Sequence, residues 1–178
     1  LLSIIGFPAF AVDDANLVDR TRRQIVEKLE GRYGCKRFLR DGHQTVLEDT
    51  SRLHYEPYEL KRFEHIECEW PLFWTYLMLD ALFRGDRDRA LDYHQRLQGV
   101  AVEREGFALL PEVYYVPEEA IAAEQANPGS QTRLPNDNVP LVWAQSLWLL
   151  GQLVLEELID VADLDPLGRR SRPGAVRE

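Results

Sequence analysis

The residues best suited to chemistry lie in a glycine-punctuated run, GRYGCKRFLRDGHQT, at positions 31–45. This run gathers four cations, one tyrosine and one acid: Arg32, Lys36, Arg37, Arg40, Tyr33 and Asp41. Guanidinium groups donate hydrogen bonds in a planar fork, a carboxylate accepts them, and tyrosine adds an aromatic face. Neighbouring sugar hydroxyls need this mixture, so the run is a candidate carbohydrate site.

Other ligands for the same run are weaker candidates. The glycines follow a predicted helix, whose C-terminal dipole would repel an anion, and this disfavours phosphate. The whole chain has a formal charge of −9, which disfavours nucleic acid because phosphate neutralisation needs a basic surface. A solvated basic turn without any ligand stays an open alternative.

A second motif is FEHIECEWP at residues 63–71. If this segment is extended, His65, Glu67 and Glu69 share one face. Its carboxylates could accept hydrogen bonds from sugar hydroxyls or form salt bridges with the basic run. The spacing matches no metal motif, so we expect no metal. Trp70 precedes a strongly apolar stretch and is either a core residue or an aromatic platform.

The third motif is LLPEVYY at residues 109–115. Glu112 stands among apolar and aromatic residues, so desolvation would raise its pKa and suit it to proton transfer. The alternative is an edge residue that points to water. The chain has no nucleophile elbow, phosphate loop or dinucleotide fingerprint, and we expect no cofactor.

Mostly helical elements must position these residues. The patterns predict helices over 13–31, 70–85, 86–99 and 139–160, with an extended segment over 105–117. The last helix has apolar residues at helical spacing, namely Trp143, Leu147, Leu150, Val154 and Leu158. Long loops separate these helices, and loops of such length tend to carry function.

The composition is that of one globular domain. Its 178 residues are 45% hydrophobic and 29% charged, and we assign 1–168 to the domain and 169–178 to a polar tail. Cys35 and Cys68 match no zinc or redox spacing, which indicates free thiols in a reducing, cytoplasmic location. No apolar run is long enough to span a bilayer. The opening LLSIIGFPAFAV lacks an initiator Met, and we expect it to lie inside a larger chain.

The chain resembles the glucoamylase-like domain of phosphorylase kinase regulatory subunits, α and β. The motifs that carry the resemblance are GRYGCKRFLRDG, RLHY, IECEWPLFWTY, LPEVYYVP, NPGSQTR, WAQSLWLL and DPLGRR. NPGSQ is closer to the β type, whereas Glu112 is closer to the α type. That domain is similar to the family 15 glycoside hydrolases. The resemblance implies an all-α fold, part of an (α/α)6 toroid of the six-hairpin glycosidase type, with long loops and short extended segments.

The resemblance also implies roles for individual residues. Arg32 and Tyr33 match the hydrolases' pair that contacts the terminal glucose, and Asp41 matches a nearby substrate-binding acid. Trp70 would be a subsite residue and Glu67 a further sugar acceptor. Glu112 matches the general base, although Val113 replaces the usual Gln.

The hydrolases' general acid lies upstream of every matched motif, and we identify no counterpart in this chain. An inverting hydrolase needs both carboxyl groups, so the chain alone should be inactive. The family further implies a kinase catalytic subunit and calmodulin as partners. No calmodulin-type helix or prenylation cysteine is visible.

Three functional hypotheses follow. The first is a regulatory carbohydrate-recognition domain that binds an α-glucan or oligosaccharide in glycogen metabolism. The second is an inverting exo-acting α-glucosidase whose acid comes from an upstream segment. The third is a structural subunit surface that keeps the old site as scaffold.

Overall fold

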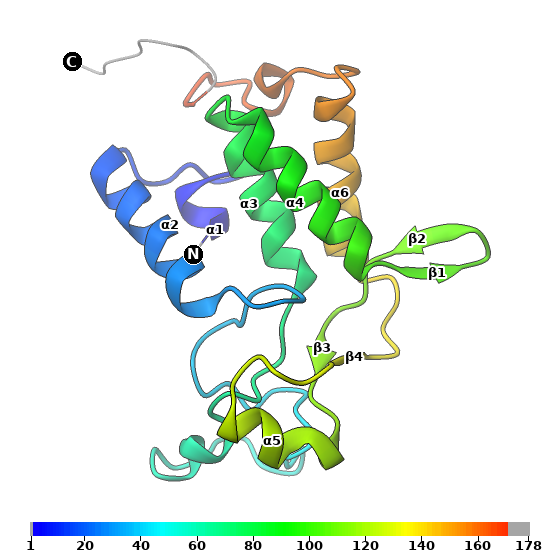
Figure 1. The fold of residues 1–178 in the computed structure, drawn as a ribbon. Helices are drawn as coiled ribbons and strands as arrows, with labels where there is room; N and C mark the ends of the chain where they lie inside the picture. The colour runs from blue at the N-terminus through cyan, green and yellow to red at the C-terminus, as the bar shows by residue number, and fades with distance from the viewer. Residues whose placement is uncertain (1, 171–178) are drawn as a thin grey trace.

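The computed structural model describes residues 2–170, and its regular structure is mostly helical, as predicted (Figure 1). The helices are α1 (Leu2–Ile5), α2 (Ala15–Leu29), α3 (Pro71–Phe83), α4 (Arg87–Val100), α5 (Ile121–Ala126) and α6 (Val142–Leu155). Short 3-10 helices cover Glu59–Phe63, Glu118–Ala120 and Val161–Leu164. The strands are β1 (Val102–Arg104), β2 (Phe107–Leu109), β3 (Tyr114–Tyr115) and β4 (Leu134–Pro135), paired antiparallel as β1–β2 and β3–β4.

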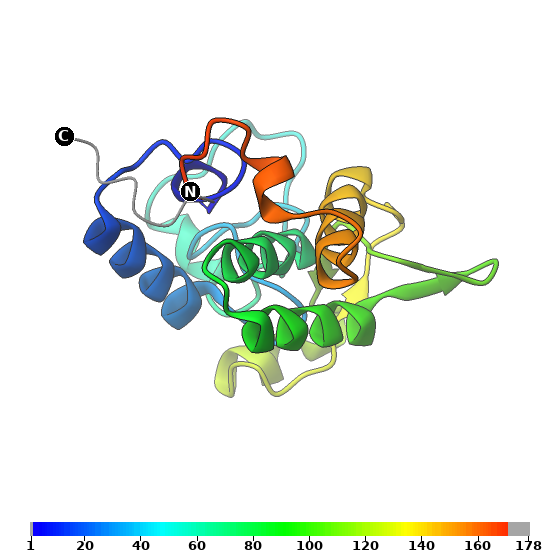
Figure 2. The same ribbon diagram turned by 90° about the horizontal axis from the view of Figure 1, so that it is seen from above.

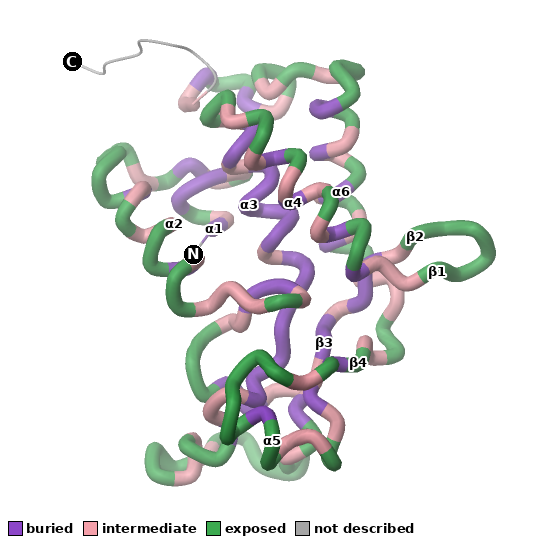
Figure 3. The backbone as a smooth tube through the Cα atoms, viewed as in Figure 1, coloured by how far each residue is buried: buried purple, intermediate pink, exposed green. Residues whose placement is uncertain are grey.

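Helix α3 forms the centre of the core. Its sequence PLFWTYLMLDALF is apolar nearly all round, and Pro71 starts it at a position where a missing N–H costs nothing. It packs against α4 and α6, and Figure 2 shows it surrounded by α2, α4 and α6. Its backbone is buried along most of its length (Figure 3). The predicted buried helix is therefore confirmed.

The buried face of α6 agrees only in part with the predicted apolar spacing, since Val154 is buried and Leu147 is partly buried against the core. Trp143 is 56% exposed and Leu158 lies beyond the helix end. The buried residues of α6 are Ala144, Trp148, Gly151, Val154 and Leu155. A Cβ at Gly151 would lie 1.9 Å from the Met78 methyl, so the Met78 side chain of α3 packs directly on the backbone of α6 at that point. Two small residues, Ala144 and Gly151, thus share the buried face of α6 with larger apolar ones.

Residues 30–70 and 110–140 gather at one end of the molecule, which we call the loop end (Figure 1). Backbone pairing joins its segments: Cys35 exchanges hydrogen bonds with Trp70, and Glu69 exchanges them with Tyr114. Tyr114 in turn pairs with Pro135 across the β3–β4 ladder. Segments far apart in sequence are thereby held side by side, next to the first turn of α3.

The boundary predicted at residue 168 stays a prediction. Arg169 donates to the carbonyl of Ala9, and Arg170 donates to that of Val12. These two residues of the predicted tail therefore contact the segment between α1 and α2. The other tail residues, 171–178, lie outside the described part. No helix within residues 2–170 has the length and apolar character of a membrane span.

Candidate functional site

Arg32 and Tyr33 form the apex of a tight turn after α2. The N–H of Gly31 donates to the carbonyl of Gly34 at 2.8 Å, which closes the turn. Gly34 has a φ of +154°, and a Cβ there would lie 2.3 Å from the carbonyl of Trp70. Only glycine permits this close approach. The glycines therefore hold the Arg-Tyr pair against the start of α3.

The two side chains of this apex are placed differently. Arg32 is exposed and donates to the carbonyl of Gly129 at 3.1 Å. The ring of Tyr33 is half-buried and stacks on Tyr114 with 4.7 Å between ring centroids. Its hydroxyl accepts the backbone N–H of Arg133 at 3.3 Å, which leaves the hydroxyl proton for another acceptor. Both residues therefore offer donors at the loop end.

A buried cluster of charged side chains contacts the backbone of this turn. The guanidinium of Arg133 lies 3.2 Å from both the Glu69 and the Glu124 carboxylates, and all three side chains are buried. Glu69 also accepts the N–H of Tyr33 at 2.7 Å, whereas Glu124 accepts that of Gly129 at 2.9 Å. Burial raises the pKa of Glu69, although Arg133 opposes this effect. The cluster thus connects the Arg-Tyr turn to the 127–133 loop.

Asp41 and Trp70 meet in a second, compact group. Both oxygens of Asp41 accept from Arg37, at 2.6 and 2.8 Å, and one also accepts from the N–H of His43. The Arg37 guanidinium lies 5.3 Å from the centre of the Trp70 ring, and the His43 ring stacks on Trp70 at 6.1 Å. Trp70 is 7% exposed. Its neighbours thus cover the indole, so Trp70 shapes the wall and does not present an open platform.

The segment 63–71 is not one extended strand with a shared face. His65 has a φ of +74°, which breaks the extended run before Glu67. The carboxylate of Glu67 is buried and binds Lys36 at 2.9 Å and the N–H of Arg40 at 2.7 Å. The alternative of a salt-bridge partner for the basic run therefore describes Glu67 in this structure.

Glu112 is surrounded by three side-chain amides, which we call the amide cluster: Gln44, Asn136 and Asn138. All three donate to Oε2 of Glu112, at 2.7, 3.0 and 3.2 Å. No described atom donates to Oε1. Backbone hydrogen bonds from Glu112 to Asn138 and from Asn136 to Val113 extend the β3–β4 pairing and fix the geometry. Glu112 therefore presents one saturated oxygen and one available acceptor.

The prediction that desolvation raises the pKa of Glu112 is wrong. Partial burial does act to raise this pKa, but the hydrogen bonds from Gln44, Asn138 and Asn136 together outweigh it. The pKa of Glu112 is consequently lowered from its ordinary value. Hydrogen bonds that stabilise the charged form have this effect. At neutral pH, Glu112 is a carboxylate that accepts and does not donate.

The sequence motifs did not indicate that the amide cluster or Arg133 belongs to the site. NPGSQTR contains Arg133, and NDN at residues 136–138 supplies two of the amides, but neither run carries a recognisable catalytic spacing. Gln44 lies 68 residues from Glu112. A buried cation among polar loop residues could have been sought as the partner of Glu69. Nothing in the local sequence indicates which carboxylate the amides approach.

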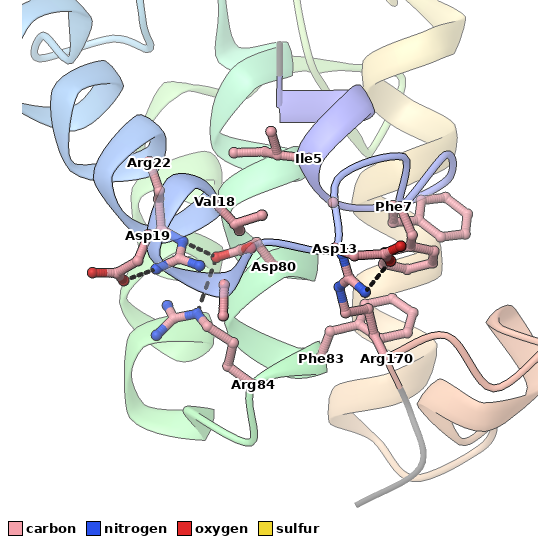
Figure 4. A pocket seen from close by; sticks show the side chains of 13 residues that line it. Ile5, Phe7, Asp13, Val18, Asp19, Arg22, Asp80, Phe83, Arg84 and Arg170 are labelled. Atoms are coloured by element: carbon pink, nitrogen blue, oxygen red, sulfur yellow. Dashed lines mark hydrogen bonds and ion pairs between the residues drawn. The ribbon is translucent and has the colours of Figure 1, made fainter. Parts of the chain in front are cut away.

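The large cavity in Figure 4 lies elsewhere. It has a volume of about 460 Å³, and Arg22 and Arg84 both bind Asp80 at its edge, between α2 and α3. None of the sequence-predicted site residues lines it. Among residues 2–170, no three His, Cys, Asp or Glu side chains are arranged to hold a metal ion.

The sequence as a whole can be compared with known protein families. The sequence pattern of glycosyl hydrolases family 15 matches residues 8–174. This match covers nearly the whole chain, so the chain belongs to that family. The turn that carries Arg32 and the segment that carries Glu112 both fall inside the matched range.

The chain is also similar to individual members of one group. It is 50% identical over 171 residues to the phosphorylase b kinase regulatory subunit alpha, liver isoform, of Mus musculus, and to the skeletal muscle isoform of Oryctolagus cuniculus. The probable regulatory subunit alpha of Drosophila melanogaster is 51% identical over the same length. Each match covers 96% of this chain and 14% of the relative, so the chain spans about a seventh of these curated relatives. The resemblance to phosphorylase kinase regulatory subunits is confirmed.

Proposed function

We propose that this chain is a glucoamylase-like carbohydrate-recognition domain of a phosphorylase kinase regulatory subunit, and that its loop end binds an α-glucan end. Arg32 and Tyr33 donate hydrogen bonds to sugar hydroxyls, and Oε1 of Glu112 accepts one. Asp41, Glu67 and Trp70 are engaged with their neighbours and hold the wall in place. The domain is part of an (α/α)6 toroid in this proposal.

The main support for the proposal is the hydrogen bonding of the Glu112 carboxylate. Its amide cluster keeps the group ionised, and its second oxygen stays available for a hydroxyl. A neutral polyol supplies hydroxyl donors for this oxygen and acceptors for Arg32. The Arg-Tyr turn and Glu112 are tied to the same small ladder through Glu69 and Tyr114. These contacts hold the two groups in place before a ligand binds, and such preorganisation lowers the cost of binding.

Titration of the full-length protein with maltoheptaose tests the proposal. We expect saturable binding in isothermal titration, and Arg32→Ala should weaken it at least about tenfold, the loss of one good charge-assisted hydrogen bond. Arg20→Ala is the matched control, because Arg20 is an exposed arginine on α2. Equal affinity in Arg32→Ala and wild type would remove Arg32 from the site. Absence of binding by the wild type would favour a purely structural role.

The second candidate is an inverting exo-acting α-glucosidase, favoured by family membership and by Glu112 as an ionised base. Inversion needs a general acid about 6.5–9.5 Å from the base, with water between them. Release of β-glucose from maltoheptaose, abolished by Glu112→Gln, would establish this activity. The 178-residue chain alone should release none, because Glu112 only accepts hydrogen bonds and the general acid of this hypothesis comes from an upstream segment.

The similarity to regulatory subunits extends the proposal to partners and location. A kinase catalytic subunit is the partner that these relatives' names imply, and calmodulin remains a family expectation. Both cysteines are free and buried, which fits a reducing cytoplasmic compartment. Co-purification of a kinase catalytic subunit with the full-length protein tests the first partner.

A further inference from the structure

Gln44 stands in a strained backbone conformation at the end of the basic run. Its φ is +60°, a left-handed value that is uncommon for residues other than glycine and costs energy. The carboxylate of Glu48 accepts its N–H at 2.7 Å and holds this conformation. Such strain persists where surrounding contacts enforce it, so the side chain of Gln44 has a direction that the loop specifies.

That direction is toward Glu112. The amide nitrogen of Gln44 donates to Oε2 of Glu112 at 2.7 Å, the shortest bond in the amide cluster. Its amide oxygen accepts from Asn136 at 2.8 Å. Both polar ends of Gln44 are therefore satisfied by the segments that form the β3–β4 ladder.

Gln44 differs from the other two amides in its origin. Asn136 and Asn138 belong to a segment that already pairs with Glu112 and Val113 through the backbone. Gln44 comes from the run that also carries Asp41 and His43. Its side chain is thus a hydrogen-bonded cross-link between the basic run and the carboxylate.

We infer that Gln44 is a positioning residue that saturates Oε2 of Glu112 and so turns Oε1 toward the ligand. The part of this inference that concerns the sugar rests on the proposed function. The part that concerns Glu112 rests only on the contacts within the protein. Without Gln44, the carboxylate loses its shortest hydrogen bond and its link to the basic run.

Other charged groups around this cross-link are few and identifiable. His43 is the titratable neighbour whose charge acts on Glu112. Glu48 binds the N–H of Gln44 and lies 3.4 Å from Nδ1 of His43. Asp41 binds Arg37. These three groups are present in both the wild type and Gln44→Met, so a comparison of the two proteins at each pH isolates the contribution of Gln44.

The first test is a double-mutant cycle in thermal stability, made in the full chain. The variants are Gln44→Met, Glu112→Ala and the double variant. We expect the double variant to lose about 2–4 °C less in Tm than the sum of the single losses, as for coupled neighbours. Gln24→Met is the control, since Gln24 binds Glu27 on the exposed face of α2 and should add independently to Glu112→Ala. Additive losses for Gln44→Met and Glu112→Ala would overturn the inference.

The second test follows maltoheptaose binding as pH falls from 6 to 3. Gln44→Met should move the acidic midpoint of binding to higher pH, because the carboxylate has lost a donor that favours its charged form. If Gln44→Met weakens binding equally at every pH, the role of Gln44 is merely structural, and this result would also overturn the inference. Failure of the wild type to bind sugar would refute the proposed function, while the thermal cycle still decides the role of Gln44.

Discussion

Among single residues, Glu112 has a pKa that its hydrogen bonds control more strongly than its desolvation does. An acid among apolar residues suggests a raised pKa, but its carboxylate meets three amide donors in the folded chain. Charged hydrogen-bond acceptors of this kind are strongly stabilised. The residue is consequently suited to accept a hydroxyl proton in a hydrogen bond or to orient a water.

The lowered pKa of Glu112 predicts a pH-dependent contribution to stability. Because the folded-state pKa lies below the ordinary value of this group, the contribution is present above that ordinary value. It is lost as pH falls through the folded-state pKa. Glu112→Gln should therefore lower Tm at pH 7 by about 1–3 °C, but by much less at pH 2.5.

Thermal melts at the two pH values check this sign. Glu119→Gln is the control, because Glu119 is exposed and should change Tm little at either pH. An equal loss for Glu112→Gln at pH 7 and pH 2.5 would contradict the stabilised carboxylate.

At the scale of elements, the buried cluster around Arg133 connects the 127–133 loop to the Arg-Tyr turn. Arg133→Met would leave the Glu69 and Glu124 carboxylates in the interior without their cation. We expect a loss of about 3–5 kcal/mol in the free energy of unfolding, as for other broken buried ion pairs. Denaturant titration of the full chain measures this loss.

The control for Arg133 is a surface pair. Arg23 lies 3.4 Å from Asp19 on α2 and is largely exposed. Arg23→Ala should cost no more than about 1 kcal/mol. A similarly small loss for Arg133→Met would show that the cluster does not brace the loop.

Two glycines test the packing of α6 on α3. At Gly151 a Cβ would clash with Met78, whereas nothing lies within 4 Å of a Cβ at Gly99 on α4. Gly151→Ala should destabilise by about 1–3 kcal/mol through overpacking. Gly99→Ala should stabilise by up to about 1 kcal/mol through better helix propensity. Denaturant titration of both variants checks the opposite signs, and a stabilising Gly151→Ala would contradict the close contact.

The sequence predicted the positions of the helices better than it predicted their buried faces or the contacts between distant side chains. Pro71 and the all-round apolar run were enough to predict α3, because local propensity and burial agree there. The apolar spacing on α6 included the buried Val154 but left out Ala144 and Gly151, because small residues carry little hydrophobic signal. Arg32, Tyr33 and Glu112 were proposed as site residues from motifs, and their roles stay predictions. The contacts of Glu112 with Gln44 and Asn136 depend on long-range pairing, which no local pattern specifies.

At the scale of the whole molecule, α6 carries an apolar stripe on its outer side. Val142, Leu149 and Leu153 are 70%, 51% and 39% exposed and recur at helical spacing. Trp143 extends the stripe. Exposed apolar surface of this kind marks interaction sites, so we predict that the isolated chain self-associates.

Sedimentation velocity over a range of concentrations measures this association. Replacing Leu149 and Leu153 by Glu should shift the 178-residue chain toward monomer, because charges on the stripe oppose its burial. Leu53→Glu is the control, since Leu53 is fully exposed on the loop end and lies outside the stripe. A wild-type chain that stays monomeric and unfolds cooperatively would contradict the prediction.

We propose that the loop end binds an α-glucan between the Arg-Tyr turn and Glu112. An experimental structure of the full-length protein with bound maltotetraose tests it most directly. We predict a terminal glucose within hydrogen-bond distance of Arg32 and of Oε1 of Glu112, with Gln44 still bound to Oε2. A sugar bound at another surface, or a saturated crystal with no sugar at the loop end, would contradict the claim.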